Sequence, residues 1–559
     1  MRVKYNECII IWDGNDMNEL SRLFLNIGDG ETVVLEKNKI YDVSQDDSFY
    51  KEGYFCSNTA KKHENPNGYR NAAIFLKDRK NIVIDGNGAT VLVHGKMTPL
   101  LFDNCENVTV RNLAVDYACP TMSEFTVISK NGGSCDIRIN DDCFFRVDGN
   151  ELFWHGEIGA DGDLFWESKS YENRRLVKIF DPETCQTRDF NRDDMKFRKI
   201  EVLGENILRI YPENPQADFA VGCVYQTRNI VRDQTGSMFQ RCRNLRFENM
   251  RIMFMHGLGM VSQFCENVAF INCDFSPKQG RTVASTADFF QFSGCRGKIE
   301  ILNCKAWGAH DDYVNVHGTH LRIVEKNGEE NSMTVRFMHD ETWGFQAFEA
   351  GDRLEFIRWD TLVPYAETTV EKYEKINDTD IKLYVDRPLP DIIVGKDVVE
   401  NVSWTPDLHV SGCDFGATSG RGILCTTRGK VVIENNRFSN LWGPALLVED
   451  DCNFWFESGY TEEIIFRNNV VSGCDFSNNW EKSPVIRYSP KVMKEDSSEY
   501  VHGKLVLNGN YFEKPMKDAH CFWLTYLREA EITDNVFDAP FNIHEVCVGR
   551  VTENGNIQK

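Results

Sequence analysis

The sequence lacks both a long apolar run and an excess of positive charge. No stretch of its 559 residues is long enough to span a membrane as a helix. The start, MRVKYNECIIIWDG, has one short apolar run, interrupted by Asp13, and no small-residue cleavage site. We therefore expect a cytoplasmic protein, although a chain whose export signal had been removed would begin in the same way. The 63 basic and 85 acidic residues give a net charge of -22, which argues against nucleic acid, membranes and polyanionic glycans as partners and favours a neutral substrate.

Motifs that mark several enzyme classes are also missing. No GxSxG sequence is present, which argues against a serine hydrolase of that type. Neither a Walker loop nor a dinucleotide-binding fingerprint occurs in the required context. The 19 cysteines contain no CxxC pair, so they indicate neither a zinc site nor a small disulfide framework, and their odd number fits a reducing compartment. We expect no metal and no cofactor.

The sequence does contain a repeated strand-and-turn pattern. Two apolar residues separated by one position are followed, two positions later, by Asn or Gly, and the pattern returns after about twenty to forty residues. The pattern occurs as Ile82-Ile84-Gly86, Val108-Val110-Asn112, Leu245-Phe247-Asn249, Val268-Phe270-Asn272, Ile299-Ile301-Asn303, Val431-Ile433-Asn435, Ile464-Phe466-Asn468 and Leu505-Leu507-Gly509. The Asn or Gly suits a corner in the left-handed region. Each such rung buries its apolar face only against the next, so we predict an all-β solenoid.

Cysteines recur at fixed places in these rungs. Cys105, Cys242, Cys265 and Cys295 fall just before the apolar pair, and Cys273 and Cys304 follow the turn Asn. Because a thiol behaves as a small apolar side chain, we interpret them as a buried ladder rather than as metal ligands or disulfides.

Two segments interrupt the rungs. The first, from about Phe125 to Val224, and the second, from about Leu321 to Val402, consist of short alternating strands with charged turns. Each is long enough for a small antiparallel barrel or sandwich, and both contain too many aromatic residues for disordered loops. We therefore divide the solenoid into residues 1–124, 225–320 and 403–559, and we place the site in the middle part.

Carboxylates converge when neighbouring rungs are aligned. Matching Met260, Phe290 and Ile423 puts Leu258, Asp288 and Arg421 in one column, two residues before each strand block. Asp312 falls in the same column, two residues before Val314, with Asp311 beside it. Stacked parallel strands lie about 4.8 Å apart, so the three Asp should share one surface next to a cation. An Asp at a single strand start is usually a turn residue, but three on adjacent rungs favour a site.

Other residues near this corner are weaker candidates. His310, His256 and Trp442 could contact a substrate together with Arg421, His310 by hydrogen bonding and Trp442 by stacking on a sugar. An isolated His is as often structural, and most Trp are expected in packing. Glu449, Asp450 and Asp451 lie at the far end of a later strand and could form only a solvated turn.

Closely spaced carboxylates suit glycoside hydrolysis. That reaction needs one protonated carboxyl and one ionised carboxyl, and mutual repulsion separates their proton affinities. A Ca²⁺ cage is an alternative use of the three Asp, although it needs more oxygen ligands than the sequence places there.

Four runs then resemble a known family. STADFFQF from Ser285, GAHDDYVNVHG from Gly308, GRGILCTTRGKVVIENNRF from Gly420 and GPALLVEDDCNFWFESG from Gly443 are similar to glycoside hydrolase family 110, the bacterial exo-acting α-1,3-galactosidases that remove terminal galactose, including that of the blood group B determinant. The resemblance covers about residues 70 to 540. It implies a right-handed parallel β-helix with two inserted barrel-like domains, a galactose-terminated oligosaccharide or glycan as substrate, and inversion at the anomeric carbon. Asp288, Asp311 and Asp312 are implied as the catalytic set, with acid and base unassigned.

A weaker likeness is to the β-helical polygalacturonases of glycoside hydrolase family 28, which also have an Asp one rung before an Asp pair. Thr286 and Ala287 replace the Asn-Thr that precedes the first Asp there, and the Arg-Ile-Lys element that binds uronate is not evident. A pectinase-like hydrolase or lyase and a non-catalytic glycan-binding solenoid remain alternatives, because a fold alone does not fix function. Oligomeric state cannot be read from the sequence, and a homo-oligomer is possible.

Overall fold

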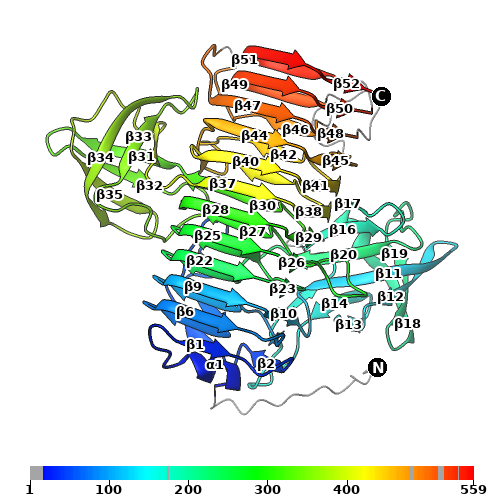
Figure 1. Cartoon of the computed structure of the whole chain (residues 1–559). Helices are drawn as coiled ribbons and strands as arrows, with labels where there is room; N and C mark the ends of the chain where they lie inside the picture. Colours follow the sequence, from blue (N-terminus) through cyan, green and yellow to red (C-terminus); the bar gives the residue numbers. More distant parts are fainter. Residues whose placement is uncertain (1–16, 173–174, 477–483, 496, 514–520, 539–540) are drawn as a thin grey trace.

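The protein is a β-helix of stacked parallel strands (Figure 1). The computed structural model describes residues 17–172, 175–476, 484–495, 497–513, 521–538 and 541–559. Helix α1 (Glu19–Phe24) lies at the N-terminal end of the stack. The predicted all-β solenoid is therefore confirmed, and no described helix is long and apolar enough to cross a membrane.

Three parallel series of strands form the faces of the solenoid. The first, here called the site series, consists of β5 (Ile74–Lys77), β8 (Leu100–Asp103), β21 (Thr235–Gln240), β24 (Leu258–Gln263), β27 (Phe290–Ser293), β30 (Val314–Thr319), β39 (Ile423–Cys425), β42 (Leu446–Val448) and β46 (Ile486–Tyr488). The second consists of β1 (Thr32–Val34), β6 (Lys80–Asp85), β9 (Glu106–Arg111), β22 (Arg243–Glu248), β25 (Glu266–Ile271), β28 (Arg296–Leu302), β37 (Asp407–Ser411), β40 (Lys430–Glu434), β44 (Glu463–Arg467) and β47 (His502–Asn508). Strands β49 (Phe522–Thr533) and β51 (Ile543–Asn554) join these two series at the C-terminal end.

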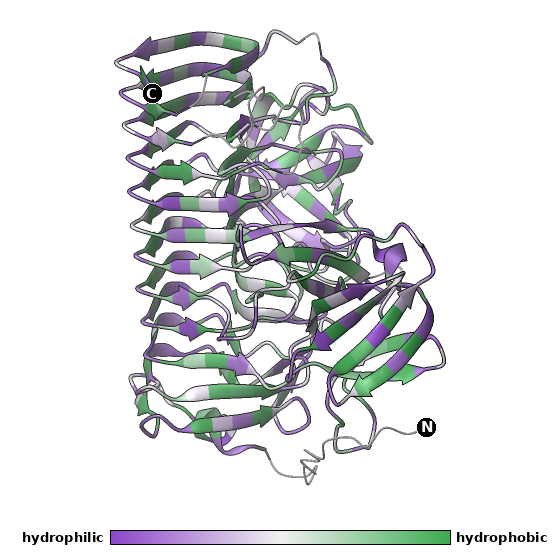
Figure 2. Cartoon of the chain, turned by 90° about the vertical axis from the view of Figure 1, so that its right-hand side faces the viewer, coloured by the Kyte–Doolittle hydropathy of each residue, from purple (hydrophilic) through white to green (hydrophobic). Residues whose placement is uncertain are grey.

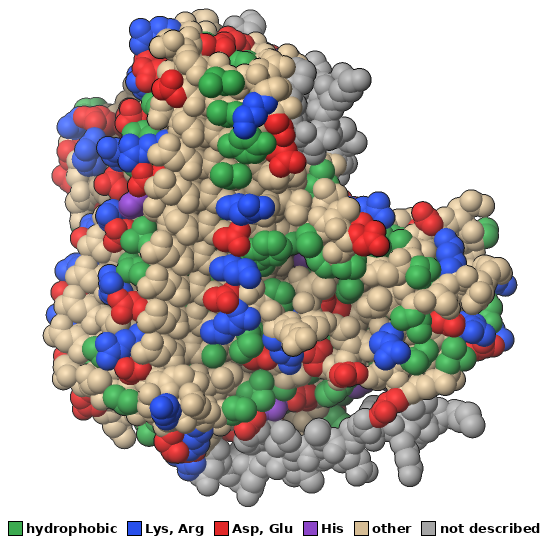
Figure 3. Space-filling view, turned by 45° about the vertical axis from the view of Figure 1, so that its right-hand side comes forward, with side chains coloured by type: hydrophobic (Ala, Val, Ile, Leu, Met, Phe, Trp, Pro, Cys, Tyr) green, Lys and Arg blue, Asp and Glu red, His purple; other side chains and the backbone are tan. Residues whose placement is uncertain are grey.

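The third series is a separate sheet of twelve strands. It consists of β2 (Ile40–Ser44), β7 (Thr90–His94), β10 (Ala114–Tyr117), β23 (Arg251–Ile252), β26 (Asp274–Phe275), β29 (Lys305–Trp307), β38 (Asp414–Thr418), β41 (Arg437–Leu441), β45 (Val470–Ser472), β48 (Tyr511–Phe512), β50 (Val536–Phe537) and β52 (Ile557–Gln558). Its register stacks Arg251, Asp274, Lys305, Asp414 and Arg437 in one column of alternating charge. Figure 3 shows such rows of basic and acidic side chains along the solenoid surface. Opposite charges on neighbouring strands favour this register.

The first insertion follows β10 and contains two antiparallel sheets. The larger, in spatial order, is β17 (Gln186–Phe190), β16 (Arg175–Asp181), β20 (Val224–Asn229), β11 (Met122–Asn131), β12 (Ser134–Ile139), β19 (Ile207–Pro212) and β18 (Phe197–Gly204), and the smaller is β13 (Phe144–Asp148), β14 (Glu151–His155) and β15 (Glu167–Lys169). A short 3-10 turn, η1 (Arg192–Met195), precedes β18. The predicted boundary at 125 falls inside β11 and the boundary at 224 coincides with the first residue of β20, so both strands extend beyond the predicted insertion.

The second insertion is a closed antiparallel barrel that lies beside the solenoid (Figure 1). Its strands are β31 (Leu321–Asn327), β32 (Ser332–Arg336), β35 (Asp380–Val385), β34 (Pro364–Lys375), β33 (Arg353–Ile357) and β36 (Val398–Asn401). The chain leaves the solenoid after β30 and returns to it at β37, so β30 still pairs directly with β39. The short strands β3 (Phe49–Lys51) and β4 (Arg70–Ala72) pair with each other, and β43 (Glu457–Ser458) pairs with the end of β30.

The corners and the core explain why the repeat folds in this way. The turn residues Asn112, Asn249, Asn272, Asn303, Asn435, Asn468 and Gly509 all have positive φ, as the pattern predicts. Gly86 is an exception, because it is needed for close approach: a Cβ there would lie 2.5 Å from the carbonyl oxygen of Asn112. Inside, Phe247 stacks on Phe270 of the next rung with ring centroids 4.7 Å apart. The rung cysteines Cys105, Cys242, Cys265, Cys273, Cys295 and Cys304 are all buried, which confirms the ladder of thiols. Figure 2 shows the resulting stack of rungs with hydrophobic and hydrophilic residues alternating along strands.

Candidate active site

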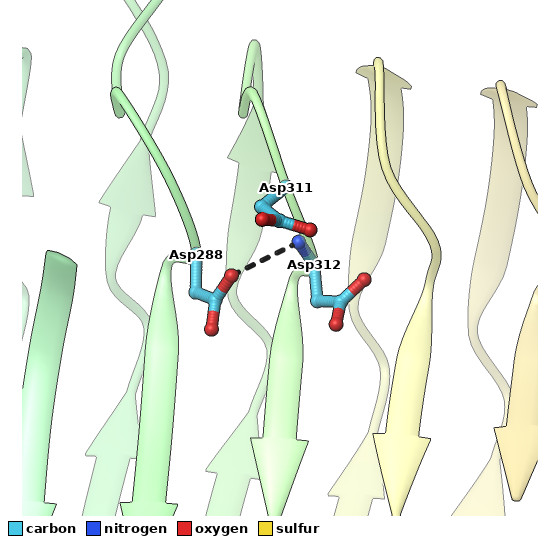
Figure 4. A group of neighbouring side chains, drawn as sticks. All are labelled: Asp288, Asp311 and Asp312. Atoms are coloured by element: carbon cyan, nitrogen blue, oxygen red, sulfur yellow. Dashed lines mark hydrogen bonds between the residues drawn. The ribbon is translucent and has the colours of Figure 1, made fainter. Parts of the chain in front are cut away.

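The predicted column of acidic residues is present in the structure. Met260 pairs with Phe290, Phe290 with Val314, and Val314 with Ile423. This is the register from which the column was predicted. Asp288, Asp312 and Arg421 therefore follow one another on successive rungs, at the corner that precedes each strand of the site series (Figure 4).

Local sequence allows this corner to pack tightly. The backbone N–H of Asp312 donates to Oδ1 of Asp288 at 3.2 Å, and the hydroxyl of Ser285 donates to the backbone oxygen of Asp288 at 2.8 Å. A Cβ at Gly420 would lie 2.3 Å from the carbonyl carbon of Asp311, so only glycine lets the next rung approach this closely. One carboxylate oxygen from each of Asp288, Asp311 and Asp312 lies within 4.8 Å of the other two.

Two arginines contact these carboxylates. Arg421 donates from Nε to Oδ1 of Asp312 at 2.5 Å and from Nη2 to Oδ2 at 2.6 Å, which is a bidentate ion pair. Its Nη2 also lies 3.4 Å from Oδ1 of Asp311, and Arg232 donates from Nη2 to Oδ2 of Asp311 at 3.3 Å. The side chain of Asp311 is 30% exposed, whereas that of Asp312 is 1% exposed. Asp311 is thus the carboxylate of the pair that faces outward.

The environment separates the proton affinities of the three carboxyls. Burial raises the pKa of Asp288 well above its ordinary value, and the charges of Asp311 and Asp312 add to the effect. Burial also raises the pKa of Asp312, to about 6, although Arg421 opposes the rise. For Asp311 burial is outweighed by the guanidiniums of Arg421 and Arg232, which lower its pKa. The cluster therefore holds both a carboxyl that keeps its proton and a carboxylate that is ionised.

The cluster opens into a cavity of about 490 Å³, a size typical of small-molecule sites. It is lined by Asn58, Arg232, Asp288, Asp311, Asp312, Asn315, Arg421, Leu424, Glu449, Asp451, Phe454, Trp455, Glu457 and Lys491. The acidic residues after β42 are thus partly at the site: Glu449 and Asp451 line the cavity, whereas Asp450 is buried against His320, its Oδ1 2.8 Å from Nε2 of that ring.

Three of the predicted substrate-contacting residues lie outside this cavity. His256 is buried, with Nε2 2.8 Å from Oδ1 of Asp233 and Nδ1 2.7 Å from the hydroxyl of Thr121. His310 is buried with Nε2 2.8 Å from Oε1 of Gln226. Trp442 is half-buried beneath the ammonium of Lys178, at 5.1 Å. All three face the first insertion or its junction with the solenoid, so packing between domains accounts for them. Arg421 does line the cavity.

The cavity residues that the sequence did not predict come from segments outside the rungs. Asn58 lies in the loop between β3 and β4, and its Nδ2 donates to Oε1 of Glu457 at 2.6 Å. Its backbone oxygen accepts from Nη1 of Arg232 at 3.1 Å, and its Oδ1 accepts from the hydroxyl of Thr342 at 3.2 Å. Arg232 follows the first insertion, and Thr342 belongs to the second. No repeat signal marks these positions, and only the excess of carboxylates at the column indicates that further cations are needed.

The three Asp oxygens are close enough for a cation to bridge, but the donor set does not fit a resident ion. Arg421 and Arg232 already contact Asp311 and Asp312 and neutralise their charge. A Ca²⁺ ion takes about six to eight oxygen ligands. The guanidiniums of Arg232 and Arg421, which both contact Asp311, already compensate the negative charge that would attract a divalent cation.

The chain is similar to several known proteins. A family model described as GLAA-B beta-barrel domain II matches residues 332–399, within the second insertion. Alpha-1,3-galactosidase A of Akkermansia muciniphila is 36% identical over 476 residues, which are 84% of this chain and 76% of that protein. Alpha-1,3-galactosidase A of Bacteroides fragilis is 33% identical over 478 residues, with the same shares of 84% and 76%. Among solved structures, the A-module of mannuronan C-5 epimerase AlgE4 of Azotobacter vinelandii superposes with a TM-score of 0.36 at 10% identity, covering 96% of this chain and 94% of that one.

Relatives at this level of identity extend over most of both chains. The chain therefore belongs to the alpha-1,3-galactosidase family, glycoside hydrolase family 110.

Proposed function

We propose that this protein is an exo-acting glycosidase that removes terminal α-1,3-linked galactose from oligosaccharides or glycans with inversion at the anomeric carbon. The observation that carries the proposal is the cluster of Asp288, Asp311 and Asp312 at the wall of one cavity, with one oxygen of each within 4.8 Å of the others. Family membership supports the linkage and the sugar, because the relatives are named for that activity.

The positions of the three carboxyls support different catalytic roles for Asp311 and for the pair of Asp288 and Asp312. Asp288 and Asp312 lie in the same column on neighbouring rungs, with one carboxylate oxygen of each within 4.8 Å of the other. One water molecule can bridge these two oxygens, because an O–H···O hydrogen bond is about 2.7 Å long. Such a water is aimed at the anomeric carbon and loses its proton to the pair as the bond forms. Asp311, the more exposed partner of Asp312, faces the leaving group and donates a proton to the glycosidic oxygen.

These roles require a proton on Asp311 when the glycosidic bond breaks. In the free cavity Asp288 holds it, because burial raises the pKa of that carboxyl well above its ordinary value. Asp311 is ionised there, because Arg421 and Arg232 outweigh the effect of burial on its pKa. The proton must therefore pass from Asp288 to Asp311 when sugar and water fill the cavity, over a distance that one shared hydrogen bond or one water can cover. The charges of Arg421 and Arg232 then hold the remaining carboxylates ionised.

The walls of the cavity support exo action. Asn58 connects three segments that are distant in sequence, through its hydrogen bonds to Glu457, Thr342 and Arg232. These bonds tie the loop between β3 and β4 to the second insertion and to β43 at the wall of the cavity. A cavity walled by segments from the solenoid and from an insertion favours entry by the end of a chain over the middle of a polysaccharide.

The test is proton NMR of the reaction on an α-1,3-galactosyl disaccharide. We expect free galactose to appear first as the β-anomer. Release of the α-anomer first would show retention and overturn the inverting mechanism, and binding without cleavage would favour the non-catalytic solenoid. Asp311→Asn should lose activity on the disaccharide but keep much of it on α-galactosyl fluoride, whose leaving group needs no proton, whereas Asp288→Asn should lose both. Equal loss of the two substrates in Asp311→Asn would contradict its role as acid.

A further inference from the structure

The outer part of the cavity carries two exposed aromatic side chains. Phe454 is 57% exposed and Trp455 is 47% exposed, and both line the cavity. The sequence has 37 Phe and 11 Trp, yet among the residues that the structure describes these are the only Phe and the only Trp that are exposed. Large aromatic surface is normally buried, so its exposure at a cavity mouth indicates a binding function.

The loop that presents these rings is held in one conformation. The carboxylate of Asp451 accepts backbone N–H groups from Asn453 at 2.7 Å and from Phe454 at 2.9 Å, and also from Trp455. The Trp455 ring stacks on His339 of the second insertion, with ring centroids 4.3 Å apart and planes inclined by 30°. A carboxylate that caps successive amides and a ring that leans on a second domain fix both aromatics before any ligand arrives, which lowers the entropy cost of binding.

Depth in the cavity determines what the rings can contact. The reacting bond must lie next to Asp311 and Asp312, of which Asp312 is buried and Asp311 partly exposed. An exo-enzyme places the terminal sugar at the inner end and the rest of the glycan toward solvent. The exposed rings therefore border the position of the sugar that carries the terminal galactose. The same cavity is lined by Lys491 and Glu449, whose Nζ and Oε1 form an ion pair at 2.6 Å and can hydrogen-bond the hydroxyls of that sugar.

From this arrangement we propose that Phe454 and Trp455 form a subsite for the second sugar of the substrate. This is the sugar that carries the terminal galactose and keeps the glycosidic oxygen after cleavage. A neutral hexose ring offers a face of C–H groups that packs on an aromatic ring, while its hydroxyls point sideways to Lys491 and Glu449. The subsite makes the protein select galactose joined to another sugar over galactose on a small leaving group. This inference rests on the proposed function and adds the recognition of the leaving group to it.

Two substrates separate this subsite from the catalytic cluster. An α-1,3-galactosyl disaccharide has a second sugar, and α-galactosyl fluoride has none. We expect Phe454→Ala and Trp455→Ala to lower kcat/KM for the disaccharide by roughly tenfold, mainly through KM, and to leave kcat/KM for the fluoride within about twofold. Trp455→Phe, which keeps a ring, should recover most of the loss. Tyr50→Ala is a matched control, because Tyr50 is 56% exposed but does not line the cavity.

Each outcome has one meaning. Unchanged kinetics of both alanine variants on the disaccharide would overturn the subsite, and so would an equal loss on both substrates, which would place the rings at the galactose or in the fold. If the wild-type protein cleaves neither substrate, the proposed function itself is wrong. If it cleaves the fluoride but not the disaccharide, the catalytic cluster stands and the second sugar is not the one that the rings accept.

Discussion

Replacing Asp288 by Asn should stabilise the folded protein while abolishing turnover. Asp288 is buried, and its pKa is raised well above the ordinary value by burial and by the charges of Asp311 and Asp312. Asn is close in shape to the protonated carboxyl, and its Oδ1 can still accept the N–H of Asp312, which lies 3.2 Å from Oδ1 in the wild type. The variant therefore loses a proton-binding group but little packing.

The sign of the effect follows from linkage. A carboxyl whose pKa is higher in the folded state binds its proton more tightly there, so the wild type loses stability as pH rises from the ordinary Asp value of about 4 toward the raised pKa. Each unit of that rise is worth about 1.4 kcal/mol. The Asn variant has no such loss. Its advantage should be near zero at pH 4 and should grow to roughly 1–2 kcal/mol at pH 8, the size typical of a single stabilising substitution.

Urea unfolding at a series of pH values is the appropriate assay. With an unfolding entropy of about 2.1 cal/mol/K per residue, one kcal/mol moves Tm of a chain this long by only about 1 °C, so isothermal curves are more sensitive. Asp451→Asn is the control: this cavity carboxylate accepts several backbone N–H groups, so its loss should destabilise the protein by about 1–3 kcal/mol. An Asp288→Asn variant that is no more stable than the wild type at pH 8, or whose advantage does not depend on pH, would refute the reasoning.

Three further predictions concern the charges around the cluster. Arg421→Met should lower the free energy of unfolding, measured in urea, by about 3–5 kcal/mol, because it leaves Asp312 buried without its bidentate partner. Arg421→Lys should recover only part of this loss. An unchanged free energy of unfolding in Arg421→Met would show that the ion pair is dispensable. The pH profile of kcat/KM should fall on the acid side near pH 6, where Asp312 takes up a proton. Arg232→Gln should move the alkaline limb to higher pH, because it removes a cation that lowers the pKa of Asp288, the group that holds the proton in the free enzyme; an unshifted limb would contradict this. Dialysis against a chelator should leave kcat unchanged, since Arg421 and Arg232 already face the Asp oxygens, and activity that Ca²⁺ alone restores would show the contrary.

The sequence was sufficient for the solenoid and for the acidic column, because both depend on local repetition. The period-two pattern of Val268 and Phe270 sets which face is inward, and the turn residue Asn272 sets where the strand ends. Once one rung is aligned with the next, the residue two positions before each strand is fixed to the same corner. Asp288 and Asp312 could therefore be placed together although the three strands β27, β28 and β29 separate them in the chain.

The remainder of the cavity was not predictable from the rungs. Asn58, Arg232 and the loop with Phe454 reach the site from segments that have no repeat, so their positions depend on how the insertions dock. The same cause explains why His310 points elsewhere: its ring contacts Gln226 of the first insertion, a contact that the rungs do not encode.

The spacing of the rungs also explains why the cluster depends on arginine. Neighbouring parallel strands hold Asp288 and Asp312 at a separation that the solenoid cannot relax, so their repulsion must be relieved by a proton or by a cation. Arg421, supplied by the next rung, removes the repulsion at Asp312 and leaves Asp288 as the group that takes the proton. Arg232, supplied from outside the repeat, does the same for Asp311. The protonation pattern of the free cavity is thus set by where the two guanidiniums enter the stacked strands, and a change in either one should redistribute the proton without moving the backbone.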